Sequence, residues 1–129
     1  MTSVVLDASA VLALLLDEPG ANIVKAALVG AAMTSVNLAE VVSHFARRDA
    51  AEAAIHRVLD PLPIEIMAFD EALAFASGMT IPLTRPAGLS LGDRACLALA
   101  SQLHIPALTA DRAWLNVASA LGVEVTLIR

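Results

Sequence analysis

The stretch SVVLDASAVLALLL, residues 3–16, indicates the fold class because it joins a strand pattern directly to a helix pattern. Its first five residues are a short apolar run, rich in valine, that ends in Asp7, which is typical of a buried strand. The segment SAVLALLL that follows predicts a helix, and the turn signal DEPG at residues 17–20 ends it. A strand followed at once by a helix is the unit from which parallel α/β sheets are built.

The same alternation continues to the end of the chain. Four more apolar segments predict strands: residues 31–36, 64–69, 107–110 and 123–128. Between them lie segments of helical spacing, at residues 21–30, 37–48, 49–59, 70–78, 90–104 and 113–121. The segment TIPLTRPAG, residues 80–88, contains two prolines and predicts a loop. We therefore expect a single α/β domain over residues 1–129, a three-layer α/β/α sandwich with a central, mostly parallel sheet.

Composition excludes several classes of protein. No apolar run approaches the ~18 residues of a membrane span, and no basic residue precedes the first apolar segment as in a signal peptide, so we expect a cytoplasmic protein without membrane contact. Cys96 is the single cysteine, which fits a reducing interior. The net charge of −5 and the 3% aromatic content argue against a nucleic-acid coat protein or a base-stacking platform. The chain also lacks the glycine-rich motifs of dinucleotide-binding and P-loop enzymes.

Four carboxylates stand where strands end and helices begin: Asp7, Glu40, Asp93 and Asp111. The carboxyl ends of parallel strands share one edge of a sheet, so these acids would crowd together. Crowded carboxylates repel one another and raise each other's pKa. A divalent cation bound among them relieves this repulsion. Oxygen donors without His or Cys suit Mg²⁺ or Mn²⁺ rather than Zn²⁺. The pattern predicts metal-dependent phosphate chemistry.

Helix capping offers a local explanation for the same acids. NLAE and SLGD both fit a capping box, with Asn37 or Ser90 as the cap and the acid three residues later reaching back. Asp111 has the position of an N-cap. Capping and metal binding can coexist, because a helix start can aim a carboxylate at the strand ends.

Small polar residues accompany the acids: Ser9 follows Asp7, Asn37 precedes Glu40, and Thr109 precedes Asp111. They could orient the carboxylates from a second layer of hydrogen bonds. They could equally cap helices or satisfy strand ends.

Four segments together resemble a PIN domain, and more narrowly the VapC-type toxin ribonucleases of bacterial toxin–antitoxin pairs. They are VVLDASAVLALLLDEPG at 4–20, NLAEV at 37–41, GLSLGDRACLALA at 88–100 and LTADRAW at 108–114. The resemblance covers essentially the whole chain. It implies a Mg²⁺- or Mn²⁺-dependent endoribonuclease that forms a homodimer and is silenced by a cognate antitoxin covering the active-site groove.

The resemblance also implies residue roles. Asp7, Glu40 and Asp93 match the central metal-site acids of that family, and Asp111 matches the fourth. Ser9 and Thr109 match its small hydroxyl positions.

The sequence leaves open the roles of two arginines and the choice between the nuclease and two rival functions. Arg94 and Arg112 each follow an acid by one position, so they could contact RNA phosphates, form a salt bridge with that acid, or lie on a solvated helix side. The rival functions are a non-catalytic α/β binding module and a DNA-directed nuclease of the same fold, since no residue is assigned to a 2′-hydroxyl.

Overall fold

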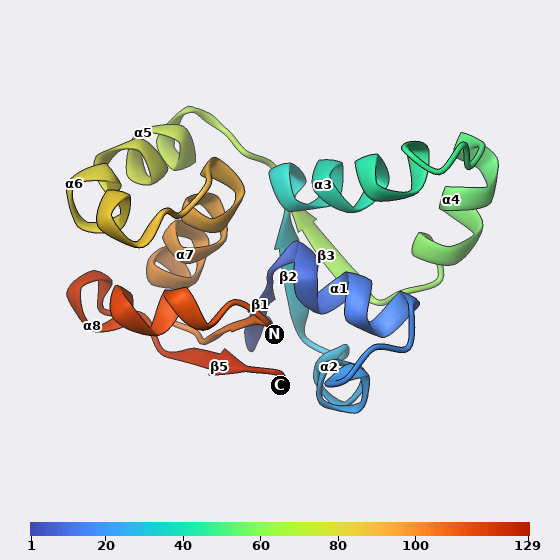
Figure 1. Ribbon diagram of the computed structural model, residues 1–129, viewed down its shortest axis with the longest axis horizontal. Helices are drawn as coiled ribbons and strands as arrows, with labels where there is room; N and C mark the ends of the chain where they lie inside the picture. The colour runs from blue at the N-terminus through green and yellow to red at the C-terminus, as the bar shows by residue number, and fades with distance from the viewer.

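The computed structural model describes residues 1–129 and contains a five-stranded sheet with helices on both faces (Figure 1). The strands are β1 Val4–Leu6, β2 Ala31–Thr34, β3 Ile64–Met67, β4 Ala107–Thr109 and β5 Val125–Leu127. They lie in the order β3-β2-β1-β4-β5, and every neighbouring pair is parallel. The helices are α1 Ala8–Leu15, α2 Ala21–Ala27, α3 Ser35–Ala46, α4 Glu52–Leu59, α5 Glu71–Met79, α6 Ile81–Thr84, α7 Leu91–Leu103 and α8 Ala118–Leu121, with 3₁₀ turns η1 Arg85–Ala87 and η2 Arg112–Asn116.

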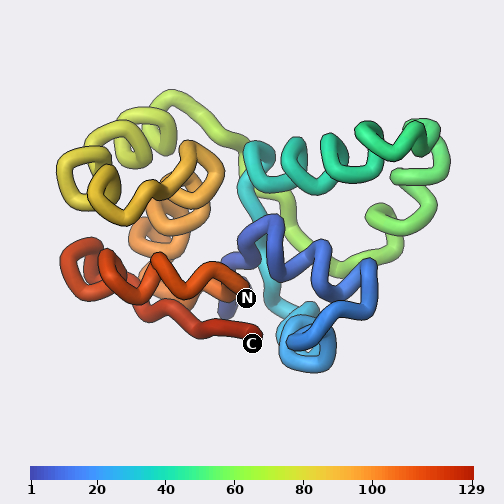
Figure 2. The backbone as a smooth tube through the Cα atoms, viewed as in Figure 1, coloured from blue at the N-terminus to red at the C-terminus, as the bar shows by residue number.

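The three layers follow from the alternation of side chains along each strand. Val4 and Leu6 of β1 point into one core, together with buried residues of α1, α2 and α3. Val5 points into the other core, with residues of α5 and α7. Figures 1 and 2 show the helices α1 to α4 on one side of the sheet and α5 to α8 on the other. The predicted α/β/α sandwich with a parallel sheet is confirmed.

The second core contains the single cysteine and the single tryptophan of the chain. Trp114 has 0% exposure and packs in this core, so it has no surface on which a base could stack. Cys96 is equally buried, and its burial raises the pKa of the thiol well above the usual value. Both side chains support the fold.

Several predicted segments differ from the structure, among them the following three. The segment expected as a loop, residues 80–88, forms α6 and η1, because Pro82 lies in a first helical turn, where its missing N–H is not needed. Residues 113–121 do not form one helix but fall within η2 and α8. The second strand ends at Thr34 rather than near Val36, since the backbone turns there into α3.

None of the helices combines the length and the apolar character that crossing a membrane would require.

The strand order places a crevice at the centre of the sheet. The chain moves outward from β1 to β2 and β3, and then returns to pair β4 with the other side of β1. In open parallel sheets, ligands bind beyond the carboxyl ends of the strands at such a reversal point. Asp7 and Thr109 lie at the carboxyl ends of β1 and β4, where the reversal occurs.

Candidate active site

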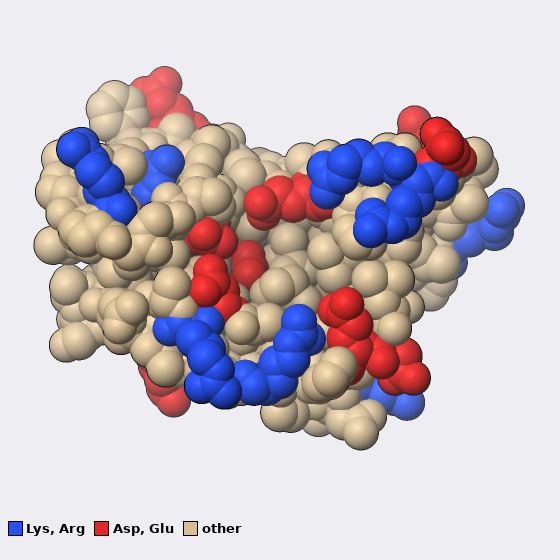
Figure 3. Space-filling model, in the orientation of Figure 1, with Lys and Arg blue, Asp and Glu red and all other residues tan.

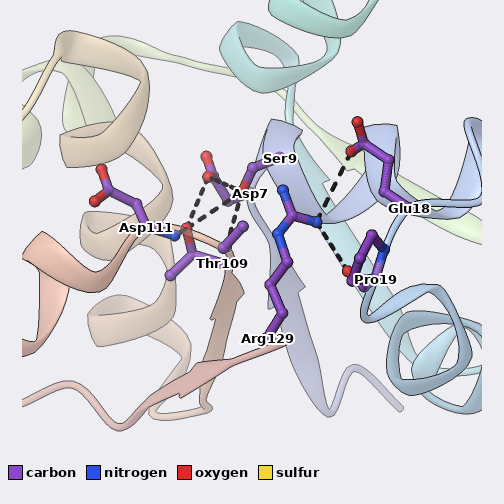
Figure 4. A network of polar contacts seen from close by, with 8 residues as sticks. Asp7, Ser9, Glu18, Pro19, Thr109, Asp111 and Arg129 are labelled. Atoms are coloured by element: carbon purple, nitrogen blue, oxygen red, sulfur yellow. Dashed lines mark hydrogen bonds and ion pairs between the residues drawn. The ribbon is translucent and has the colours of Figure 1, made fainter.

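Asp7 is the buried acid of the reversal point. Its backbone N–H donates to the carbonyl of Leu108 at 3.0 Å, which fixes it beside β4. It occupies the N-cap position of α1, yet its side chain makes no capping bond. Instead, its Oδ2 accepts hydrogen bonds from Ser9 Oγ at 2.7 Å and Thr109 Oγ1 at 2.9 Å (Figure 4). The Asp7 side chain therefore does not serve the helix that it precedes.

The surroundings of Asp7 disfavour its charge. Only 5% of the residue is exposed, and this burial raises the pKa of the carboxyl from 3.8 to about 6. The bonds from Ser9 and Thr109 lower the pKa, whereas the negative charges of Asp93 and Glu40 raise it. Two of the other predicted acids, Asp93 and Glu40, therefore act electrostatically on Asp7.

The two hydroxyls also join the ends of β4 and α1. Ser9 Oγ lies 3.3 Å from Thr109 Oγ1 and accepts from the backbone N–H of Ala110 at 3.0 Å. Thr109 Oγ1 accepts from the N–H of Asp111 at 3.1 Å. Ser9 and Thr109 thus contact Asp7 and satisfy strand-end backbone groups at the same time, so both roles weighed from the sequence occur together.

Glu40 is held by Asn37, but not through a capping box. The N-cap of α3 is Thr34, whose hydroxyl accepts from the N–H of Asn37 at 3.0 Å. The prediction that Asn37 caps this helix was wrong, because the helix begins three residues earlier and Glu40 falls in its second turn. The spacing Thr34-x-x-Asn37, typical of a hydroxyl cap bonded to the third helical residue, is the sequence signal that points to the true start.

The Asn37 side chain is fully buried and makes three hydrogen bonds, one of which ties α3 to α7. Its Oδ1 accepts from Thr34 Oγ1 at 2.7 Å, while its Nδ2 donates to Glu40 Oε1 at 2.8 Å and to the carbonyl of Gly92 at 3.1 Å. Because both acceptors of Nδ2 are fixed by the same amide, Asn37 sets where the Glu40 carboxylate lies relative to α7.

Asp93 takes part in the capping box predicted for α7, and that prediction is confirmed. The N–H of Ser90 donates to Asp93 Oδ2 at 2.8 Å, and the N–H of Asp93 donates to Ser90 Oγ at 3.2 Å. The Oδ1 atom of Asp93 has no hydrogen-bond partner within the chain. One oxygen therefore caps the helix, and the other is available to a ligand.

Asp111 lies further out than the other acids. It is exposed, and its Oδ1 accepts from the N–H of Ala113 at 2.9 Å, which makes it the predicted N-cap of η2. Its charge is not among those that raise the pKa of Asp7. Asp111 therefore stands at the rim of the group rather than at its centre.

Arg94 and Arg112, the two arginines that follow acids, lie in different surroundings. Arg94 donates through one guanidinium nitrogen to the carbonyl of Ser77 in α5 at 3.2 Å, which joins α5 to α7. Arg112 is exposed. Neither forms an ion pair with the acid before it, so the salt-bridge alternative for both residues was wrong.

The donor chemistry of Asp7, Glu40 and Asp93 fits a hard divalent cation. A buried carboxylate that is raised in pKa by two neighbouring carboxylates is stabilised by a positive ion among them. Several acidic side chains gather in the hollow at the centre of the face shown in Figure 3, while others lie nearer its edges. No group of three or more Asp, Glu, His or Cys side chains has the close arrangement of a ready-made metal site, so metal binding requires the side chains to draw together.

A second concave feature lies away from the acids. An apolar groove of about 760 Å³ runs between α3, α4 and the edge strand β3, and Val42, Ile55 and Ile66 are among its lining residues. Ile66 remains 43% exposed, which is high for an isoleucine.

The fold and the acids at the carboxyl edge of its sheet define a class of protein. The family model of the PIN domain matches residues 4–120, and the chain belongs to the PIN-domain family. No curated protein sequence matches the chain significantly.

Solved structures of low sequence identity share the fold. A toxin–antitoxin complex from Klebsiella pneumoniae has a TM-score of 0.74 at 18% identity, with 98% of each chain covered. DNA-bound VapBC from Salmonella typhimurium has a TM-score of 0.73 at 12% identity over 100% of each chain, and FitAcB from Neisseria gonorrhoeae has 0.72 at 18% over 95% of each.

Proposed function

We propose that this protein is a VapC-type toxin, an endoribonuclease that hydrolyses RNA phosphodiester bonds with Mg²⁺ or Mn²⁺ held by its acidic cluster. The observation that carries the proposal is the buried Asp7 at the reversal point of the sheet, whose pKa the charges of Asp93 and Glu40 raise. A buried carboxylate whose pKa is raised by two other carboxylates does not stabilise the fold at neutral pH. Acids of this kind occur mainly at functional sites, so we assign Asp7 to one. The PIN-domain family supports a nuclease.

Asp7, Glu40 and Asp93 would hold the ion, and Asp111 would hold a second ion or position water at the rim. A bound Mg²⁺ or Mn²⁺ would polarise the scissile phosphate and activate water for in-line attack. The chain's own part is to hold carboxylate oxygens ionised and in place. Ser9 and Thr109 do this for Asp7, because their hydrogen bonds favour the charged carboxylate and limit its rotation.

Arg112 is our candidate for a contact with RNA phosphates. It is exposed, follows the rim acid Asp111, and has no ion-pair partner in the chain. Arg94 is a weaker candidate, since its guanidinium already donates to the carbonyl of Ser77. Figure 3 shows basic side chains on two sides of the acidic hollow, which would give a phosphate backbone contacts beside the cluster.

We further propose that a cognate antitoxin binds this protein, as the complexes that share its fold suggest. The apolar groove between α3, α4 and β3 is suited to an amphipathic segment of such a partner. If the adjacent reading frame encodes a small antitoxin-like protein, Val42→Glu, which puts a charge into the groove, should abolish its capture. Exposed Phe75 and Met79 on α5 are candidates for a contact between two copies of the chain, which light scattering of the free protein tests.

Cleavage by the purified, partner-free protein tests the nuclease. RNA should be cut with Mg²⁺ and left intact with EDTA or by Asp7→Ala and Asp93→Ala, while Glu124→Ala, which removes an exposed acid outside the cluster, cuts normally. Cleavage that survives EDTA or either cluster variant would remove the metal–carboxylate model. Single-stranded DNA of the same sequence distinguishes a DNA-directed enzyme. A non-catalytic module would cut neither and would show no stabilisation by divalent cations.

A further inference from the structure

Gly92 occupies a buried position in the first turn of α7, where the helix itself does not need a glycine. Its backbone is not in the left-handed region that glycine alone tolerates. Alanine is a better helix former than glycine, so local structure would favour a side chain here. The reason for the glycine must lie in what surrounds it.

A Cβ at Gly92 would collide with the carboxylate of Glu40, whose Cδ would lie 2.6 Å away and whose two oxygens would be closer still. The missing side chain therefore provides the space in which the Glu40 carboxylate lies. The collision would involve only the far end of a flexible side chain, so an alanine would displace that carboxylate rather than disrupt the backbone.

Asn37 makes this space a defined position. Its Nδ2 donates both to Glu40 Oε1 and to the carbonyl of Gly92, and its Oδ1 is held by Thr34. A Glu40 carboxylate pushed away from Gly92 would lose the Asn37 bond that now orients it. Asp93 is the next residue after Gly92 and is held by its capping box, so the spacing between Glu40 and Asp93 depends on the same turn.

We propose that Gly92 is a positioning residue: it leaves the space in which the Glu40 carboxylate lies against α7, from where that carboxylate can draw together with Asp7 and Asp93 around a divalent cation. The inference rests on the proposed function for the cation, but the position of Glu40 can be tested without it. Gly92 touches neither substrate nor ion and acts through Glu40 alone.

Gly92→Ala tests the role, with Gly78→Ala as its matched control. Gly78 lies in α5, where a Cβ would meet nothing within 4 Å. Titration with Mn²⁺ in the absence of RNA should show about 10- to 100-fold weaker binding for Gly92→Ala, the loss that follows when a carboxylate ligand is misoriented. Gly78→Ala should bind Mn²⁺ like the wild type. Without metal, Gly92→Ala should still unfold cooperatively near the wild-type temperature, because the helix preference of alanine offsets the loss of the Asn37–Glu40 bond.

Two further measurements distinguish failure of the positioning role from failure of the proposed function. Glu40→Asp in the Gly92→Ala background shortens the displaced side chain, so the double variant should bind Mn²⁺ more tightly than the product of the two single effects predicts. The Asn37 side-chain amide should shift in the NMR spectrum of Gly92→Ala without any metal. Wild-type Mn²⁺ affinity together with an unshifted Asn37 amide would overturn the positioning role. Failure of the wild type to bind Mn²⁺ would instead overturn the proposed function, and the Asn37 amide would still report whether Gly92 sets the position of Glu40.

Discussion

Asp7 and Thr109 are 102 positions apart in the sequence, yet Thr109 Oγ1 donates to Asp7 Oδ2 at 2.9 Å. The bond joins the carboxyl ends of β1 and β4, where the order of strands reverses. The Thr109 hydroxyl supplies part of the hydrogen bonding that a buried carboxylate otherwise takes from water. This contact therefore favours the charged form of Asp7, against the larger effect of burial, which favours the neutral form.

Asp7→Asn should stabilise the metal-free protein at pH 8. Burial gives Asp7 a pKa of about 6 in the folded state against 3.8 in the unfolded chain, so its contribution to stability is full below pH 3.8 and is lost as the pH rises through about 6. Asparagine avoids that loss, and the free energy of unfolding at pH 8 should rise by roughly 3 kcal/mol. Urea denaturation in EDTA at pH 4 and pH 8 measures the difference, which should vanish at pH 4. An Asp7→Asn variant that is less stable than the wild type at pH 8 would contradict this prediction.

Mn²⁺ affinity should fall as the pH is lowered through about 6. A proton on Asp7 competes with the cation, so affinity should drop about tenfold per pH unit below the pKa and level off above it. Calorimetric titrations at pH 5, 6 and 7 give the profile. An affinity that is equally strong at pH 5 and pH 7 would show that Asp7 does not bind the ion.

Thr109→Val should move the midpoint of that profile to higher pH. The hydroxyl bond lowers the pKa of Asp7, so its removal raises the pKa further and weakens Mn²⁺ binding at pH 6 more than at pH 8. Thr84→Val is the matched control, because Thr84 is also fully buried but its hydroxyl donates to the carbonyl of Thr80. The same midpoint in both variants would mean that Thr109 serves packing alone.

Ser90→Ala and Asp93→Ala should separate capping from chemistry. Both break the capping box of α7 and should lower the free energy of unfolding by about 1 kcal/mol. Only Asp93→Ala removes a carboxylate from the cluster, so RNA cleavage should disappear there and persist in Ser90→Ala. Thermal unfolding and cleavage rates of the two purified variants are the measurements. Loss of cleavage in both would show that Asp93 acts through the cap.

Local patterns predicted the helix α7 well and the start of α3 poorly. The Ser90–Asp93 box depends only on residues three apart, and it forms as expected. NLAE had the same spacing, but Thr34 begins the helix earlier, because its hydroxyl bonds Asn37 and its backbone leaves β2 in an extended conformation. Two candidate caps in one segment cannot be ranked by spacing alone.

Periodicity, turns and caps depend on near neighbours, so sequence patterns predicted the alternation of the five strands with most of the helices, and the places of Asp7, Asp93 and Asp111 at a strand end or helix start. The burial of Asp7 against Thr109, and the bond from Asn37 across 55 positions to the carbonyl of Gly92, depend on the three-dimensional packing. Burial and desolvation arise from residues that meet through the sheet, so the pKa of Asp7 and the space reserved for Glu40 could not be read along the chain.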